Sequence, residues 1–294
     1  MIVALAGGVG GARLAVGLAA VLPPSRLAVV VNTGDDFEHH GLHVSPDLDT
    51  VMYTLAGLNN AATGWGRAGE SWNFMAALGE LGGARWFNLG DRDLATHVLR
   101  SEALRGGSPL SAVMQTLAAC LGVRHALLPM SDQPVRTRVK TARGELAFQD
   151  YFVREHCRPR VQGFRFAGAR SASPAPALRK LMRSGKVRGV VICPSNPFVS
   201  VAPILAVPAI RAWLKERDFP VVAVSPLVGG AALKGPAAKM MRELKLEADA
   251  AGIARHYGRL VDGWVIDRAD AKLQAEIGVG GRRVLDRKST RLNS

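Results

Sequence analysis

The sequence has few cysteines and no long apolar run. Its three cysteines, Cys120, Cys157 and Cys193, are widely spaced and odd in number, which favours reduced thiols over a disulfide framework or a zinc site. No apolar run approaches the roughly 18 residues of a transmembrane helix, and no basic segment precedes the apolar residues 2–6. We therefore expect a cytoplasmic protein without a membrane span or signal peptide.

Acidic residues are scarce relative to basic ones, with 24 Asp and Glu against 38 Lys and Arg and a formal net charge of +14. We do not expect nucleic-acid binding, because the basic residues are scattered and do not alternate with aromatic residues. Residues 287–294 carry three positive charges and no apolar periodicity, so we expect a disordered or non-native tail after a domain spanning residues 1–286. The remaining positive charge suits small polyanionic ligands such as diphosphates.

The sequence does contain a glycine-rich turn near its start. An apolar strand, residues 2–6, enters the turn and a helical pattern leaves it, so Gly8, Gly10 and Gly11 are predicted to cradle a phosphate with backbone N–H groups. The turn is not a dinucleotide fingerprint, because Arg13 stands where the third glycine belongs. It is not a P-loop either, because no Lys-Ser or Lys-Thr follows.

Two adjacent carboxylates follow a second apolar strand, residues 27–31. That strand runs through Asn32 and Thr33 to Asp35 and Asp36. In a parallel sheet, the loops at the carboxyl ends of neighbouring strands meet at one edge. A phosphate-binding turn beside two carboxylates indicates a nucleotide held with a divalent metal. In the alternative, one carboxylate binds a ribose hydroxyl, as in NAD enzymes.

Two further carboxylates open the helix predicted after Ser45 and Pro46. Asp47 and Asp49 lie about 200° apart around that helix, so they cannot both face one metal ion. We expect Asp49 to reach the ion and Asp47 to cap the helix or face water. In the alternative, both merely favour the positive end of the helix.

Polar turns follow the other predicted strands as well. Residues 85–89 are predicted as a strand that leads to Asp91, Asp93 and His97, and the last two share one helix face. They form either a solvated pair or a substrate contact. Serine, asparagine and glycine in such turns, and a nearby lysine, can hold phosphate or base groups. The further candidates are Ser131, Asp132, Ser195, Asn196, Ser225, Gly229, Gly230 and Lys234.

Between residues 134 and 170 the helix–strand alternation is interrupted. Residues 135–140 alternate apolar and basic side chains, and a turn at 143–144 precedes a second extended segment, which predicts an antiparallel hairpin. The alternation then resumes, with a helix predicted over 202–217 and a last strand over 263–267. The predicted fold is α/β, a doubly wound, mostly parallel Rossmann-like sheet in a single domain with an inserted β-hairpin or small subdomain.

The combination of these motifs resembles the 2-phospho-L-lactate transferase family, over nearly the whole chain before the tail. The set is far more specific than the glycine turn alone. The motifs are Gly-Gly-Val-Gly-Gly-Ala-Arg at 7–13, Asn-Thr-Gly-Asp-Asp at 32–36, Pro-Asp-Leu-Asp-Thr at 46–50, Leu-Gly-Asp-Arg-Asp-Leu-Ala-Thr-His at 89–97, Pro-Met-Ser-Asp at 129–132, Ser-Asn-Pro at 195–197, Ser-Pro-Leu-Val-Gly-Gly at 225–230, Lys-Gly-Pro-Ala-Ala-Lys-Met-Met at 234–241 and Ala-Gly-Ile-Ala-Arg-His-Tyr at 251–257.

The resemblance implies a magnesium-dependent transferase of coenzyme F-420 biosynthesis. Such an enzyme moves a phospholactyl, phosphoenolpyruvyl or phosphoglyceryl unit from a guanosine diphosphate donor to a hydroxyl of the deazaflavin Fo and releases GMP. It implies Mg²⁺ held by Asp36 and Asp49, with Asp35 as an alternate ligand or neighbour. Catalytic roles fall to Asp36, Asp49, Asp93 and His97. The implied substrate-binding residues are Gly8, Gly10, Gly11, Asn32, Thr33, Asp91, Ser131, Asp132, Ser195, Asn196, Ser225, Gly229, Gly230 and Lys234.

Two other functions stay open at this point. A nucleotide-sugar-binding regulator of the gluconeogenesis-factor type shares the opening turn and predicts binding without turnover, whereas residues 90–97 and 129–132 favour the transferase. An NAD-dependent oxidoreductase is disfavoured by the glycine spacing. The motifs do not specify which three-carbon acid the donor carries. The family resemblance implies a homodimer that binds small-molecule substrates, and neither nucleic acid nor a membrane.

Overall fold

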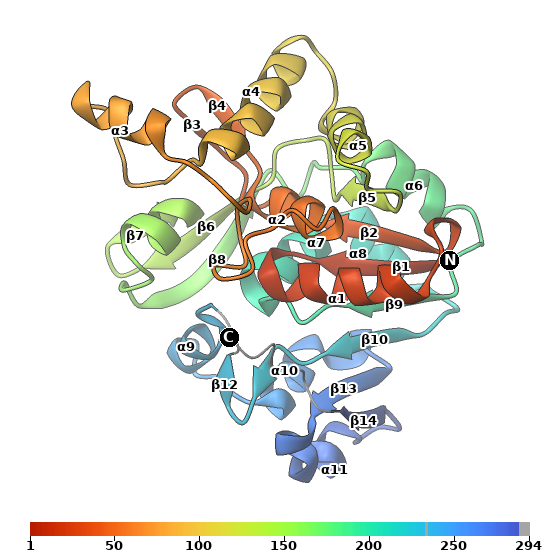
Figure 1. Ribbon diagram of the computed structural model, residues 1–294. Coiled ribbons are helices and arrows are strands. Elements are labelled where there is room, and N and C mark those ends of the chain that lie inside the picture. The colour runs from red at the N-terminus through yellow and green to blue at the C-terminus, as the bar shows by residue number, and fades with distance from the viewer. Residues whose placement is uncertain (233–234, 288–294) are drawn as a thin grey trace.

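The computed structural model describes residues 1–232 and 235–287 of the 294-residue chain. Its centre is a seven-stranded sheet in the order β14-β13-β10-β9-β1-β2-β5, in which every neighbouring pair is parallel (Figure 1). The strands are β1 (Ile2–Ala6), β2 (Leu27–Val31), β5 (Ala126–Pro129), β9 (Gly189–Ile192), β10 (Val221–Val224), β13 (Gly263–Asp267) and β14 (Arg283–Arg287). The predicted doubly wound α/β fold is confirmed.

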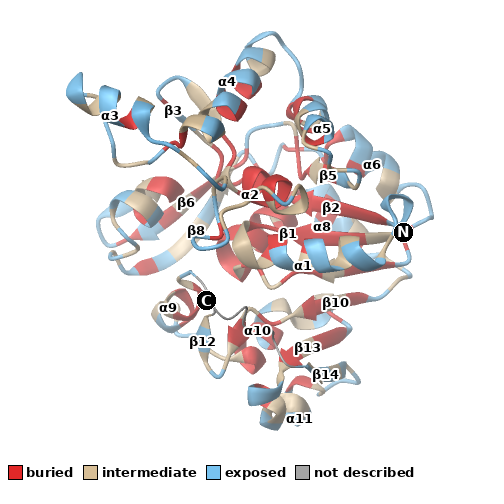
Figure 2. Ribbon diagram, viewed as in Figure 1, coloured by how far each residue is buried: buried red, intermediate tan, exposed pale blue. Residues whose placement is uncertain are grey.

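Both faces of the central strands are buried, as expected for a parallel sheet covered by helices (Figure 2). In β1, Val3 and Leu5 belong to one apolar cluster, and Ala4 and Ala6 belong to the cluster on the opposite face. The alternation explains why the strand has no polar residue: each side chain enters one core or the other.

Helices cover the two faces and extend beyond the sheet. In Figure 1, α3 and α4 project away from the sheet, whereas α1 and α2 pack against each other beside it. The helices are α1 (Gly8–Val21), α2 (Pro46–Leu55), α3 (Asn73–Glu80), α4 (Asp91–Arg105), α5 (Leu110–Cys120), α6 (Pro176–Met182), α7 (Ala202–Ala206), α8 (Pro208–Lys215), α9 (Ala237–Glu243), α10 (Ala250–Tyr257) and α11 (Gln274–Ile277).

The predicted antiparallel hairpin is present, and it is part of a larger unit. Strands β6 (Arg136–Thr141) and β7 (Gly144–Ala147) form the hairpin, and β8 (Val161–Ala167) pairs with β6 on the other side. The sheet order is therefore β7-β6-β8. Two smaller hairpins lie elsewhere, β3–β4 (Phe37–His39 and Leu42–Val44) and β11–β12 (Leu227–Val228 and Ala231–Ala232).

Two predicted elements are wrong. Residues 85–89 form no strand, because Trp86 and Phe87 turn into an aromatic cluster in which the Phe37 and Phe87 ring centroids lie 4.8 Å apart. The helix predicted over 202–217 is broken into α7 and α8, because Val207 is extended and Pro208 starts a new helix.

The C-terminal boundary also differs from the prediction. Strand β14 follows the predicted last strand and pairs with β13, and Arg287, the first residue of the expected tail, is the last residue of β14. Residues 288–294 lie outside the described residues.

Over the described ranges, no single helix is long and apolar enough to cross a membrane. Residues 197–206 and 208–215 together would be long and apolar enough for a span, but the two segments lie at 90° to each other.

Candidate functional site

The glycine turn lies at the switch point of the sheet, where the strand order changes direction. β1 is the strand between β2 and β9, and the loops after β1 and β9 contact each other. The Gly7 N–H donates to the Ser195 hydroxyl oxygen at 3.0 Å, and that hydroxyl donates to the Gly7 carbonyl at 2.8 Å. In open α/β sheets, this crevice at the carboxyl ends of the strands is where ligands bind.

The glycines of the turn are required by chain packing. A Cβ at Gly10 would lie 2.2 Å from the Pro194 carbonyl oxygen, and a Cβ at Gly11 would lie 2.5 Å from the Ser195 hydroxyl oxygen. Gly8 has a φ of +61°, a conformation that favours glycine. The turn can therefore approach the loop after β9 more closely than any larger residue would allow.

The predicted phosphate cradle has fewer donors than the sequence indicated. The Gly8 N–H donates to the Asp47 carboxylate at 2.7 Å, so it is already paired within the protein. The next N–H groups, those of Val9 and Gly10, belong to the first turn of α1, where the helix itself supplies no acceptor. They are the donors that an anion could meet at the positive end of α1.

Asn32 joins the two acidic segments that flank the turn. Its side-chain amide donates to Asp35 at 2.7 Å and to Asp47 at 2.9 Å, and its carbonyl oxygen accepts from the Gly34 N–H at 2.8 Å. Asp47 is only 5% exposed. The expectation that Asp47 caps the helix or faces water is wrong, because the carboxylate is enclosed between Gly8 and Asn32.

Burial and neighbouring negative charge raise the pKa values of Asp35 and Asp47. Burial raises the pKa of Asp35 well above its usual value, and the nearby charges of Asp47 and Asp36 add to the rise. Burial raises the pKa of Asp47 to about 6 against the opposing hydrogen bonds from Asn32 and Gly8. The negative charges of Asp35, Asp36 and Asp47 act on one another, and a cation would offset them.

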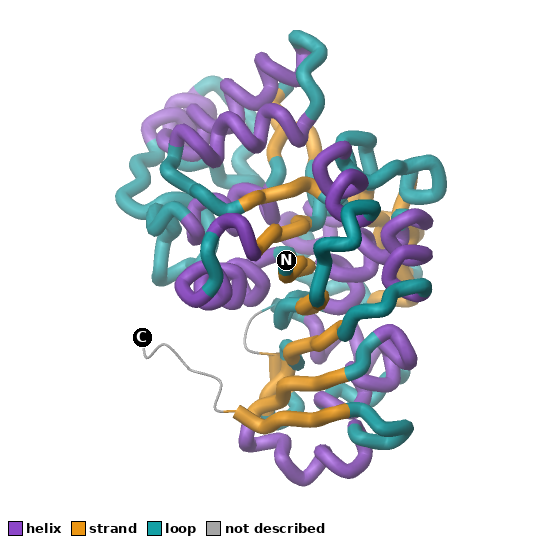
Figure 3. The backbone as a smooth tube through the Cα atoms, turned by 90° about the vertical axis from the view of Figure 1, so that its right-hand side faces the viewer, coloured by secondary structure: helices purple, strands orange, loops and turns teal. Residues whose placement is uncertain are grey.

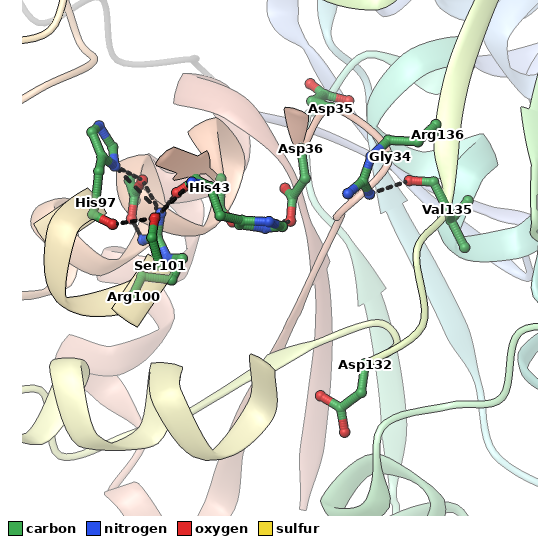
Figure 4. A network of polar contacts seen from close by, with 12 residues as sticks. Gly34, Asp35, Asp36, His43, His97, Arg100, Ser101, Asp132, Val135 and Arg136 are labelled. Carbon is green, nitrogen blue, oxygen red and sulfur yellow. Dashed lines mark hydrogen bonds and ion pairs between the residues drawn. The ribbon is translucent and has the colours of Figure 1, made fainter. Parts of the chain in front are cut away.

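Asp36 has an oxygen available for such a cation. One oxygen accepts from the Ser45 hydroxyl at 2.9 Å and lies 3.2 Å from His43 Nε2. Among the described residues, the buried Oδ1 has no hydrogen-bond partner. Figure 4 shows the His43 ring directed toward the Asp36 carboxylate. A buried carboxylate oxygen without a donor fits a hard divalent cation.

Asp49 lies in a different environment, on the opposite side of α2 from Asp47. Its carboxylate is bound by the guanidinium of Arg100 through two hydrogen bonds, that from Nη1 measuring 3.1 Å. His97 Nδ1 lies 3.7 Å from the same carboxylate. Arg100 is 0% exposed, so a complete ion pair is buried between α2 and α4.

Asp93 and His97 belong to the same buried network, so the solvated-pair interpretation is wrong. The Tyr53 hydroxyl donates to Asp93 at 2.6 Å, and His97 Nε2 lies 3.5 Å from the other Asp93 oxygen. His97 is 1% exposed, whereas the Asp93 side chain is 16% exposed. In the part of the chain described, Asp49, Asp93 and His97 are the three residues whose potential metal-ligand atoms all lie within 4.8 Å of one another.

Three predicted residues stabilise helix starts. Asp91 accepts hydrogen bonds from Ser71, Asn73 and Phe74 at the beginning of α3. Asp132 accepts from the N–H and hydroxyl of Ser111 in α5, and it lies apart from Asp36 in Figure 4. Asn196 accepts from the N–H groups of residues 198 and 199, at the start of a short helical segment, η3 (Pro197–Val201).

The remaining predicted residues are mostly in turns. Ser131 accepts from the Gln133 N–H, and Ser225 bonds to Leu227 in both directions. Gly229 and Gly230 both have positive φ, and the Gly229 N–H donates to the buried carboxylate of Asp270. The Thr33 hydroxyl is buried without a partner among the described residues. Lys234 lies outside the described residues.

The sequence prediction missed Arg100, Tyr53 and His43 and misjudged Asp47. Arg100 follows His97 by three residues and Asp93 by seven, and Tyr53 follows Asp49 by four, so each lies on the same helix face as a predicted residue. This spacing of polar residues along one helix face was the feature of the sequence that could have identified Arg100 and Tyr53. His43 has no such indication, because it reaches Asp36 only through the β3–β4 hairpin.

Comparisons with known proteins show the family to which the chain belongs. A model of the family described as 2-phospho-L-lactate transferase CofD matches residues 2–279. A phosphoenolpyruvate transferase from Streptomyces griseus subsp. griseus is 45% identical over 288 residues, covering 96% of this chain and 90% of the relative. A 2-phospho-L-lactate transferase from Methanospirillum hungatei is 39% identical over 270 residues, covering 92% of this chain and 90% of the relative.

A solved structure shares the fold at low sequence identity. It is a UPF0052 family protein from Bacillus halodurans, which matches with a TM-score of 0.62 and 15% identity over 98% of this chain and 92% of that chain. The resemblance inferred from the motifs and the matches over nearly the full length agree. The chain belongs to the 2-phospho-L-lactate transferase CofD family.

Proposed function

We propose that the protein catalyses the magnesium-dependent transfer of a three-carbon phospho-acid unit from a guanosine diphosphate donor to a hydroxyl of the deazaflavin Fo. The hydroxyl oxygen forms a bond to the phosphorus that carries the acid, the bond from that phosphorus to the bridging oxygen breaks, GMP leaves, and the hydroxyl proton is released to solvent. The observation that carries the proposal is the convergence of the glycine turn with buried Asp35, Asp36 and Asp47 at the switch point.

On the donor side, the free N–H groups of the first turn of α1 bind diphosphate oxygens. Asp36, with Asp35 beside it, would hold Mg²⁺, which when bound neutralises charge on the diphosphate. Asp49, the other predicted ligand, already has Arg100 as its counter-charge. We therefore place Asp36 and Asp35 first as ligands, and Asp49 supports the site through Arg100 and His97.

On the acceptor side, Asp93 is the end of the buried network that reaches solvent. Burial raises the pKa of Asp93, but His97 and Tyr53 outweigh burial, so its pKa lies below the usual value and the group stays a carboxylate. A fixed carboxylate can accept a hydrogen bond from the attacking hydroxyl and orient it. His97 is enclosed, so it positions Asp93 and does not touch the acceptor.

We further propose that the enolpyruvyl donor is preferred over the lactyl and glyceryl donors. The support is that the Streptomyces griseus relative, at 45% identity, is named for phosphoenolpyruvate, whereas the Methanospirillum hungatei relative, at 39%, is named for 2-phospho-L-lactate. Incubating the protein with Fo, Mg²⁺ and each of the three donors in parallel, and measuring GMP release and Fo conversion, tests both proposals.

The metal assignment has its own test. Asp36→Asn removes one negative charge from the site, and GMP release is expected to fall about a hundredfold or more. Asp218→Asn, at an exposed position, is the matched control. Mg²⁺ should also raise the unfolding temperature of the wild type and the control but not of Asp36→Asn. GMP release that survives EDTA contradicts the assignment. Guanosine nucleotide binding without any GMP release would favour a non-catalytic regulator.

A further inference from the structure

The edge of the parallel sheet opposite the candidate site carries a row of arginines. Ile2 pairs with both Leu27 and Gly189, and Ala28 pairs with Ala126. Arg124, Arg26 and Arg188 lie just before β5, β2 and β9, so all three are at this edge of the sheet, with β1 between β2 and β9. Neighbouring strands are about 4.8 Å apart, so the row is compact. Figure 3 views the molecule from this edge, where the N-terminus lies.

A second group of cations adjoins this row. Arg179, Lys180, Arg183 and Lys186 lie on α6 and on the segment that connects it to β9, and all are exposed. Together with Pro176 and Ser184 they line an open hollow of about 600 Å³. That volume is within the range of roughly 300–1,000 Å³ for small-molecule sites.

None of these seven cations is neutralised within the described protein. None has a carboxylate within 4.0 Å or a side-chain hydrogen bond to a described residue, whereas Arg100, Arg217 and Arg255 all have acidic partners. The three segments that carry them, residues 21–27, 120–126 and 176–189, contain no Asp or Glu. Arg179 and Lys180 lie in the last turn of α6, where the helix dipole favours cations. The helix dipole does not explain the positions of the other five.

Unneutralised like charges repel one another, and this repulsion is relieved by an external anion. Arginine binds phosphate oxygens in pairs, and lysine binds them as a point charge. The same three segments contain no Phe, Trp or Tyr, so they offer no stacking surface for the bases of a nucleic acid. The chemistry of the face therefore matches phosphate groups without bases.

We propose that this basic face, made of Arg26, Arg124, Arg179, Lys180, Arg183, Lys186 and Arg188, binds a multivalent phosphate ligand centred on the hollow beside α6. The ligand is either a soluble oligophosphate or the headgroup of a phosphorylated lipid. Because the face lies at the strand starts and the candidate site lies at the strand ends, both can be occupied at once.

The test compares two triple variants with the wild type. Arg179→Gln/Arg183→Gln/Lys186→Gln removes three cations from the face, and Arg211→Gln/Lys215→Gln/Arg242→Gln removes three exposed cations elsewhere. Calorimetric titration with tripolyphosphate at low and physiological salt is the first arm. The second arm is co-sedimentation with phosphatidylcholine vesicles, with and without about 5% phosphatidylinositol bisphosphate. The face variant should bind about tenfold more weakly or worse, and the control should bind like the wild type.

The outcomes distinguish a soluble phosphate ligand from a lipid headgroup, and both of these from nucleic acid or no binding at all. Loss of tripolyphosphate binding in the face variant alone supports a soluble ligand, and loss of vesicle binding in that variant alone supports a lipid headgroup. Equal binding by all three proteins, an equal loss in both variants, or no binding by the wild type in either arm overturns the proposal. Tighter binding of a short DNA duplex than of tripolyphosphate overturns it in favour of nucleic acid. Both variants should keep the wild-type unfolding temperature and GMP release, so failure here leaves the proposed transfer intact.

Discussion

Replacing Gly10 by alanine should destabilise the protein because of packing rather than ligand binding. The added Cβ would lie 2.2 Å from the Pro194 carbonyl oxygen and 3.3 Å from its carbon. The obstacle is backbone, so it cannot rotate away, and either the first turn of α1 or the loop after β9 must move by close to 1 Å. Overpacking of this kind typically costs about 1–3 kcal/mol. The same displacement would disturb the Gly7–Ser195 contact and the donor side of the site.

Gly17→Ala is the matched control, because it makes the same chemical change in the same helix. A Cβ at Gly17 meets nothing within 4 Å, and alanine is about 0.5–1 kcal/mol more favourable than glycine inside a helix. Urea unfolding should therefore separate the two variants by about 1.5–4 kcal/mol, with Gly17→Ala above the wild type. GMP release should fall only in Gly10→Ala. Equal stability of the two variants would refute the packing explanation and leave ligand approach as the reason for Gly10.

Two further predictions concern buried charge. Arg100→Met leaves Asp49 buried without a counter-charge and should lower the free energy of unfolding in urea by about 3–5 kcal/mol. Arg105→Met, at the exposed end of α4, is the control and should change the free energy of unfolding very little. A loss of less than about 1 kcal/mol for Arg100→Met would contradict the buried ion pair. Burial and the nearby charge of His40 lower the pKa of His39 to about 4, so the folded state prefers the neutral ring. Its contribution is present above the unfolded pKa near 6.5 and is lost as pH falls toward 4, by at most about 3 kcal/mol. His39→Asn should flatten this part of the pH–stability curve, and His40→Asn should change it less, because that variant removes only the smaller of the two causes.

The parallel sheet could be predicted because its central strands are continuous apolar runs that end in glycine or polar turns. β14 escaped prediction because it is an edge strand in which Arg283, Leu285 and Arg287 are exposed, so it lacks an apolar run. Residues 85–89 misled the prediction because Trp86 and Phe87 favour strands in general. Here the half-buried rings pack against one another and against Phe37, and residues 85–89 pair with no strand.

The candidate site could be predicted at the level of motifs but not of contacts. The glycine turn and the acidic segments are local in sequence, and parallel topology brings their loops together. Which carboxylate has which partner depends on how α2 and α4 pack, and sequence spacing does not give that packing. The helical angle correctly separated Asp47 from Asp49, but it could not show that Arg100 would be buried against Asp49.

The position of β1 between β2 and β9 has a consequence for the order of assembly. β2 follows β1 within the first 31 residues of the chain, but β9 begins only at residue 189. During synthesis, one edge of β1 therefore stays unpaired until the chain has been made beyond residue 189. An apolar strand with an open edge invites pairing with another chain. A ribosome-bound fragment ending near residue 185 lacks Pro194 and Ser195, so its glycine turn has no loop to pack against. We expect such a fragment to associate with other chains more readily than the full-length protein.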